Sequence, residues 1–185
     1  MRKINIWVME GYWSDHPSDS TTVRPMFQTL ADSDIAAHVH RHVNDVDDIV
    51  RSLTVLGQRR QSRYSVAYIA LHGSSGMVEV GGESVTLPEL AEMLPSARSL
   101  ESKIVHFSSC SVLQDEDACK AFLSMTGAKA ITGFNRDVEW VESLAFEMLM
   151  FNTLVHYERF GNFYNEISAR YGDLIDRLGF TVIRP

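Results

Sequence analysis

The sequence is poor in the features that mark secreted, membrane-spanning and nucleic-acid-binding chains. It has only two cysteines, Cys110 and Cys119, which argues against a disulfide framework and fits a reducing compartment. No apolar run approaches the ~18 residues of a membrane span, and the first apolar segment is too short for a secretory signal. A formal net charge of −7 disfavours nucleic acid and anionic membranes as partners. These absences predict a cytoplasmic protein.

Linkers, repeats and two well-known catalytic motifs are also missing. No stretch rich in proline, glycine and serine divides the chain, and no internal repeat is present. The chain has neither a Gly-x-x-x-x-Gly-Lys phosphate loop nor a Gly-x-Ser-x-Gly nucleophile elbow. Because 185 residues is a usual length for one domain, we expect a single domain over residues 1–185.

Strand-like and helix-like patterns alternate along the chain. Periodicity predicts strands at residues 4–9, 35–43, 66–71, 103–109, 128–134 and 181–183. It predicts helices at residues 21–30, from 45 onward, and at 87–94, 115–125, 139–157 and 163–178. Gly81-Gly82 indicates a small hairpin between residues 77–80 and 84–86. This alternation predicts a three-layer α/β/α sandwich with a mainly parallel central sheet.

Two reactive side chains stand where neighbouring predicted strands end. His72-Gly73 follows the strand at 66–71, and Ser109-Cys110 closes the strand at 103–109. Ligands bind beyond the carboxyl ends of parallel strands, so we expect His72 and Cys110 to face one cleft. A free thiol has a pKa of about 8.5, and a nearby histidine can stabilise the thiolate or protonate a leaving amine. The pattern predicts a catalytic His72–Cys110 dyad.

Gly73 adds a third element to this pattern. Because it has no side chain, its N–H can approach a substrate carbonyl closely, and with the Cys110 N–H it can form an oxyanion hole. Taken singly, a cysteine after a strand fits a core position, and a lone His-Gly pair is an equally weak signal of catalysis. Their occurrence at consecutive strand ends favours the catalytic interpretation.

The order strand, His72-Gly73, hairpin, helix, strand, Ser109-Cys110 resembles the caspase-like (clan CD) cysteine peptidases, most closely small bacterial CHAT-like domains. Residues 131–140, a glycine-aromatic strand end followed by a tryptophan, are similar to theirs as well. The resemblance implies a peptidase that cuts protein substrates through a Cys110 thioester, with no cofactor and no metal. It also implies a regulated bacterial effector that a partner or signal activates.

The resemblance also indicates where a substrate pocket would lie. In this family, the residue two positions before the cysteine often lines the pocket for the side chain that precedes the cleaved bond. Here that residue is Ser108, which is small and neutral. Ser108 therefore argues against a preference for aspartate and gives no support for a basic side chain.

Five further residues are candidates for the walls of this pocket. Asp137, Glu139 and Arg24 are placed to supply charge from neighbouring loops, although acidic residues also commonly begin helices. Trp13 and Trp140 are placed to wall the cleft, and packing is the simpler role for Trp140.

Four other histidines have alternative roles. His38, His40 and His42 alternate on one predicted strand and therefore share a face. That spacing is compatible with zinc, but a half-exposed strand face is the simpler interpretation, and we expect no metal. His106 lies inside the strand at 103–109, where we expect a core histidine. By parity it points to the same side as Cys110, so it is the reserve candidate for the base.

Two rival functions remain open at this stage. The first is a catalytically inactive caspase-like module that binds a protein partner or small ligand in the same cleft. The second is a flavodoxin-like nucleotide-binding domain, whose ligand would lie at the loop after the first strand, where Gly11 is the only glycine.

Overall fold

The computed structural model describes residues 3–14 and 16–185 and shows an α/β fold built on a six-stranded sheet. The sheet order is β2-β1-β3-β7-β8-β9, in which only β9 runs antiparallel to its neighbour. Its strands are β1 (Ile4–Glu10), β2 (Ala36–His42), β3 (Val66–Ala70), β7 (Ile104–Phe107), β8 (Ala130–Phe134) and β9 (Phe180–Ile183). The predicted α/β class with a mainly parallel sheet is confirmed.

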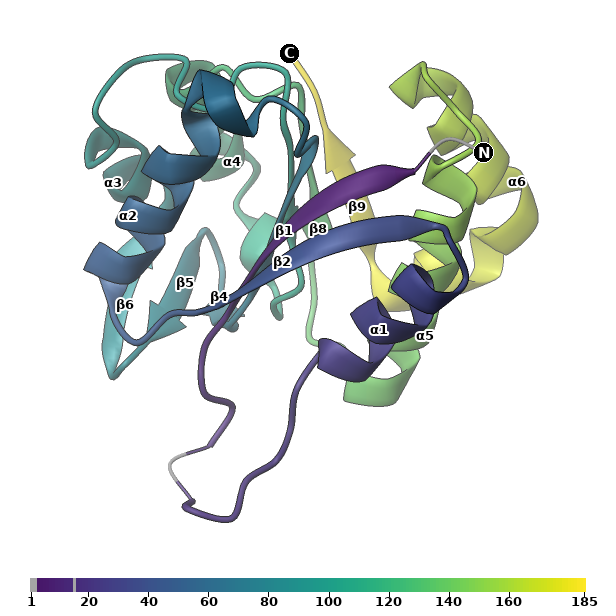
Figure 1. Cartoon of the computed structure of the whole chain (residues 1–185), viewed down its shortest axis with the longest axis horizontal. Coiled ribbons are helices and arrows are strands. Elements are labelled where there is room, and N and C mark those ends of the chain that lie inside the picture. Colours follow the sequence, from purple (N-terminus) through teal and green to yellow (C-terminus); the bar gives the residue numbers. More distant parts are fainter. Residues whose placement is uncertain (1–2, 15) are drawn as a thin grey trace.

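Helices cover both faces of this sheet (Figure 1). One face is covered by α1 (Arg24–Asp32), α5 (Trp140–Leu154) and α6 (Phe160–Leu178). The other is covered by α2 (Val46–Gly57), α3 (Leu87–Glu92) and α4 (Glu116–Thr126). Strand alternation divides the core between the two faces. In β1, for example, Trp7 and Met9 join the core under α2 to α4, whereas Ile6 and Val8 join the core under α1 and α5.

Local sequence sets the helix ends. Asp45 and Asp115 accept hydrogen bonds from backbone N–H groups in the first turns of α2 and α4. Thr86 forms a capping box with Glu89 at the start of α3. Gly127 ends α4 in the left-handed region, with φ +67°, which glycine adopts without a Cβ penalty. These caps explain why most predicted boundaries lie close to the observed ones.

A small second sheet stands between β3 and α3. It comprises β4 (His72–Ser74), β5 (Met77–Val80) and β6 (Glu83–Thr86), all antiparallel. Gly81 and Gly82 form its tight turn with φ +60° and +79°, as a two-residue hairpin loop requires. The predicted hairpin is confirmed, but β4 was missed because only three residues pair in it.

The connection from β1 to α1 leaves the body of the molecule at the edge where the parallel strands end (Figure 1). Across residues 3–14 and 16–185, no helix has the length and apolar character needed to cross a membrane.

Candidate active site

The carboxyl ends of β3 and β7 bring His72 and Cys110 to the same edge of the sheet. These strands are neighbours and parallel, with Ile69 opposite Phe107. Their pairing continues past β7, because Ser108 N–H donates to the Ile69 carbonyl at 2.8 Å. The predicted adjacency of the two strand ends is therefore confirmed, and each candidate residue follows its strand closely.

Cys110 lies in a turn that is tied to the segment between β8 and α5. Its side chain is partly exposed, and Sγ lies 3.9 Å from the Val138 carbonyl oxygen. The next residue, Ser111, has a left-handed backbone with φ 57° and donates its N–H to the Arg136 carbonyl at 3.1 Å. The Ser111 hydroxyl donates to Asp137 Oδ1 at 2.7 Å. In the described part of the chain, no backbone carbonyl accepts the Cys110 N–H, which leaves this donor for a ligand.

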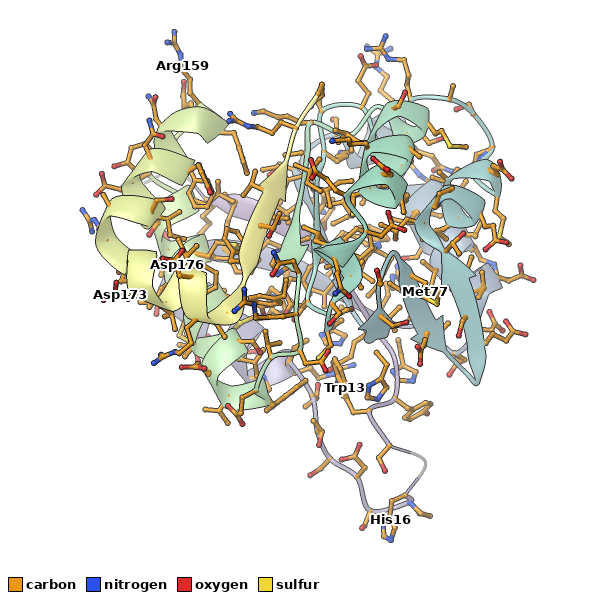
Figure 2. The ribbon with its side chains drawn as sticks, turned by 180° about the vertical axis from the view of Figure 1, so that it is seen from behind. Trp13, His16, Met77, Arg159, Asp173 and Asp176 are labelled. Carbon is orange, nitrogen blue, oxygen red and sulfur yellow. The ribbon has the colours of Figure 1, made fainter. Side chains whose placement is uncertain are left out.

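His72 is exposed and is oriented by a main-chain carbonyl. Its Nε2 lies 2.9 Å from the Trp13 carbonyl oxygen. A carbonyl only accepts, so Nε2 bears the hydrogen, and in the neutral ring Nδ1 holds the lone pair. The Trp13 indole packs edge-on against the His72 ring at 5.4 Å and against Trp140 at 4.5 Å. Figure 2 shows Trp13 at the base of the projecting β1–α1 connection, with His16 near its far end.

Gly73 lets the backbone of β4 approach the Cys110 turn. A Cβ at this position would lie 2.5 Å from Val112 Cγ2, 3.0 Å from Ser109 Cβ and 3.1 Å from the Cys110 carbonyl oxygen. Any larger residue would separate β4 from the turn. Ser109 Oγ is buried here and has no hydrogen-bond partner among the described residues. This close approach packs β4 directly against the Cys110 turn.

Glu10, at the end of β1, is a site residue that the sequence analysis missed. Its carboxylate is 4% exposed and accepts hydrogen bonds from Trp13 Nε1 and Thr22 Oγ1, at 3.0 and 2.8 Å, and from Val23 N–H at 2.7 Å. His40 Nε2 lies 2.7 Å from Oε2. Burial alone raises the pKa of this carboxyl, but the four hydrogen bonds outweigh burial and lower it. The sequence held one signal for this residue: by strand alternation, the acidic Glu10 lies on the same buried face as Ile6 and Val8.

A hollow of about 290 Å³ borders His72. It lies between the β1–α1 connection and the β5–β6 hairpin, and its walls include the residues Tyr12, Trp13, His72, Glu79 and Glu83. Glu79 is also directly opposite His72 in the β4–β5 ladder. Cys110 is not among the described residues that line this hollow, so the hollow adjoins only the histidine side of the site.

Of the six residues expected to form a substrate pocket, Trp13 lines this hollow and the other five do not. Asp137 accepts a hydrogen bond from Ser111 in the Cys110 turn, and Trp140 packs on Trp13. Ser108, by contrast, is 8% exposed, and Arg24 begins α1. Glu139 caps α5, where its carboxylate accepts the Glu142 N–H at 2.9 Å. Helix capping thus accounts for Glu139, the alternative noted from the sequence.

Residues 3–183 match DUF6642, a family of unknown function. The chain belongs to this family. No curated protein matches the sequence.

In this DUF6642 chain, His106 is a core residue. It is fully buried, with Nε2 2.9 Å from Glu147 Oε1 and Nδ1 2.8 Å from Thr132 Oγ1. The reserve expectation that His106 serves as the base is therefore wrong, because strand parity carries its ring into the core beneath α5. Tyr68 hydrogen-bonds to the other Glu147 oxygen, and its hydroxyl lies 2.8 Å from Ser108 Oγ. Burial, and next the Glu147 charge, raise the pKa of Tyr68 well above its ordinary value.

The three histidines of β2 in this DUF6642 chain have separate partners. The His38 ring lies 5.6 Å from that of Phe27, His40 meets Glu10, and the His42 ring lies 4.1 Å from that of Tyr12. Within residues 3–14 and 16–185, no three metal-ligating side chains of His, Cys, Asp or Glu come together. These separate contacts agree with the simpler interpretation of the three histidines as part of a half-exposed strand face.

Cys119 is enclosed by the core, whereas Cys110 is partly exposed. It is fully buried in α4, as expected from its position in the sequence. Burial, and next the charges of Asp115 and Glu116, raise the pKa of this thiol to about 12. Both cysteines are free thiols, so Cys119 offers an internal reference for the chemistry of Cys110.

Proposed function

We propose that this chain is a caspase-like cysteine endopeptidase, with Cys110 as nucleophile and His72 as acid and base. One observation supports the proposal above all. Adjacent parallel strands end in a partly exposed thiol and in an imidazole whose Nε2–H is held by the Trp13 carbonyl. This hydrogen bond leaves Nδ1 to exchange protons with a thiol or a substrate.

The proposed reaction needs only groups of this chain and one water molecule. The Cys110 thiolate attacks the peptide carbonyl carbon, and an S–C bond forms while the oxygen becomes an oxyanion. The N–H groups of Gly73 and Cys110 are proposed to stabilise this oxyanion. His72, as imidazolium, protonates the leaving amine as the C–N bond breaks, which leaves a thioester. Water then attacks the thioester, His72 removes its proton, and the carboxylic acid and the free thiol are released.

The proposed substrate is a protein or peptide, and the proposed compartment is the cytoplasm, where free cysteines persist. In line with the bacterial CHAT-like domains that the sequence resembles, we propose that a protein partner or a signal controls the activity. The description of the family names no activity, so these statements rest on site geometry and on the resemblance.

Alkylation of the folded protein with iodoacetamide tests the dyad. We expect Cys110 to react faster than both Cys119 and a model thiol, and to slow in a His72→Ala variant, with each thiol followed by peptide mass spectrometry. In parallel, incubation with a peptide mixture should give new cleavage products that a Cys110→Ala variant does not produce. Equal, slow alkylation of both thiols together with no cleavage would favour the rival, an inactive module that binds a ligand in this cleft.

The flavodoxin-like rival gains support from one observation. The order β2-β1-β3-β7-β8 follows the 2-1-3-4-5 arrangement of flavodoxin-like sheets, whose ligand lies between the first and third strands. At that position, however, the Glu10 carboxylate already accepts the Val23 N–H just before α1, and a second negative charge would be repelled there. We expect no nucleotide-dependent rise in melting temperature, and a clear rise would favour the rival.

A further inference from the structure

The β1–α1 connection is fastened at both of its ends by the Glu10 carboxylate. Trp13, near the start of the connection, donates Nε1–H to Glu10 Oε1 at 3.0 Å. Thr22 and Val23, at its end, donate to Glu10 through a hydroxyl at 2.8 Å and a backbone N–H at 2.7 Å. His40 approaches the same carboxylate from β2 at 2.7 Å. Glu10 thus sets where the connection leaves and rejoins the body of the molecule.

Trp13 connects this carboxylate to His72. Its side chain is held by Glu10, and its carbonyl, on the same residue, accepts the His72 Nε2–H at 2.9 Å. Its ring also contacts the ring of His72, at 5.4 Å, and that of Trp140, at 4.5 Å. A shift of the indole would therefore move the carbonyl that determines which His72 nitrogen is protonated.

We propose that Glu10 is a positioning residue for His72 and acts through Trp13. This inference rests on the proposed function, because it assumes that the protonation and orientation of His72 control Cys110. The Glu10–Trp13 hydrogen bond holds the Trp13 carbonyl in place, and that carbonyl holds Nε2–H and leaves Nδ1 for proton transfer. A buried carboxylate at the end of β1 then belongs to the site although it touches no reacting atom.

Two substitutions, each of which removes one hydrogen bond to the Glu10 carboxylate, distinguish this positioning role from a purely structural one. Trp13→Phe removes the Nε1–H donor but keeps an aromatic ring and the backbone carbonyl. Thr22→Val removes a donor to the same carboxylate at the far end of the connection, away from His72. Each variant loses one hydrogen bond to Glu10, and Thr22→Val also loses the acceptor of the Arg24 N–H, so a purely structural role of Glu10 predicts a disturbance in both variants.

The readout is the rate of Cys110 alkylation as a function of pH, with Cys119 as the internal reference. For Trp13→Phe we expect an altered pH midpoint and a rate about tenfold lower, as for loss of an outer partner of a functional histidine. For Thr22→Val we expect the wild-type profile. Similar profiles for the two variants would overturn the inference. It would be overturned equally by a Trp13→Phe profile that matches the wild type.

A measurement on the unmodified protein guards against a Trp13→Phe variant that fails to fold. Long-range ¹H–¹⁵N NMR should show neutral His72 as the Nε2–H tautomer, and Glu10→Gln should shift the His72 ring signals. An Nδ1–H tautomer in the wild type, or unchanged His72 signals in Glu10→Gln, would refute the inference.

Failure of the proposed function gives a different result. If wild-type Cys110 is no more reactive than Cys119, or if His72→Ala leaves its rate unchanged, the dyad itself is refuted. If His72→Ala slows Cys110 while Trp13→Phe and Thr22→Val behave alike, only the role of Glu10 is refuted.

Discussion

Glu147 and His106 form a hydrogen-bonded pair inside the core, with their side chains fully buried and Oε1 2.9 Å from Nε2. Tyr68 donates a hydrogen bond to the other Glu147 oxygen, and the Thr132 hydroxyl forms a hydrogen bond with Nδ1 of His106. Every polar atom of the two partners therefore has a hydrogen bond, which offsets the large cost of removing such groups from water. The network lies directly beneath Ser108, at the start of the Cys110 turn.

Removal of Glu147 should destabilise the protein strongly. Glu147→Ala leaves the buried Nε2 of His106 without a partner and removes the carboxylate that accepts from Tyr68, so we expect a loss of about 3–5 kcal/mol in the free energy of unfolding. Urea denaturation followed by circular dichroism measures this loss. Glu142→Ala, in the same helix, removes a partly exposed pair with Arg177, for which we expect a change of at most about 1 kcal/mol. Equal losses in the two variants would contradict the prediction.

Gly73→Ala should disturb the Cys110 turn. Its Cβ would lie 2.5 Å from Val112 Cγ2, so β4 and the turn must move apart, at a cost of about 1–3 kcal/mol. We expect slower Cys110 alkylation in a protein that still folds. Gly172→Ala in α6 is the control, because its Cβ meets nothing within 4 Å, and alanine favours a helix by up to ~1 kcal/mol. A wild-type alkylation rate in Gly73→Ala would argue against close packing of β4 on the turn.

Cys119 should react only when the protein opens. Its pKa of about 12 and complete burial leave almost no accessible thiolate at neutral pH. Alkylation of Cys119 should therefore increase across the urea unfolding transition, as measured by mass spectrometry with circular dichroism in parallel. Rapid labelling of Cys119 in the absence of urea would show that α4 detaches locally.

Glu10 should make the protein sensitive to acid. Its pKa in the folded state lies below the ordinary value of 4.5, because four hydrogen bonds favour the charged form more than burial disfavours it. Its stabilising contribution is therefore fully present above about pH 4.5 and is lost as the pH falls through the folded-state pKa. Chemical denaturation at pH values from 3 to 7 (about the range in which carboxyls titrate) should show a smaller acid-dependent loss in Glu10→Gln than in the wild type. Identical pH dependence would contradict this assignment.

The sequence predicted the architecture well because local signals were strong. Asp45, Asp115 and Gly127 mark helix ends through capping chemistry, and Gly81-Gly82 marks a tight turn. The strand ends that bring His72 and Cys110 to one edge followed from the same patterns. Local patterns do not record contacts between distant segments, however. The contacts of Trp13 with Glu10 and His72, and of Ser108 with Tyr68, are of this kind.

Parity reasoning also failed at one instructive place. His106 and Cys110 are an even number of positions apart, which implied a shared face if the strand continued to Cys110. The strand instead ends at Phe107, and the left-handed backbone of Ser111 belongs to a turn that redirects the chain. Alternation holds only inside a regular strand, so it placed His106 correctly with respect to the core and gave no information about Cys110.

Tyr68, His106 and Thr132 lie side by side on three adjacent strands, and this row restricts how those strands can align. If the register of β7 shifted by one residue, the His106 side chain would point to the opposite face of the sheet. A shift by two residues would keep His106 on the same face but would separate its ring from Glu147. A wholly apolar row would tolerate the longer slide, whereas a buried carboxylate without its partner does not. The polar row of Tyr68, His106 and Thr132 thus fixes the register of β3, β7 and β8. It thereby also fixes where the ends of β3 and β7, which are followed by His72 and Cys110, lie relative to each other.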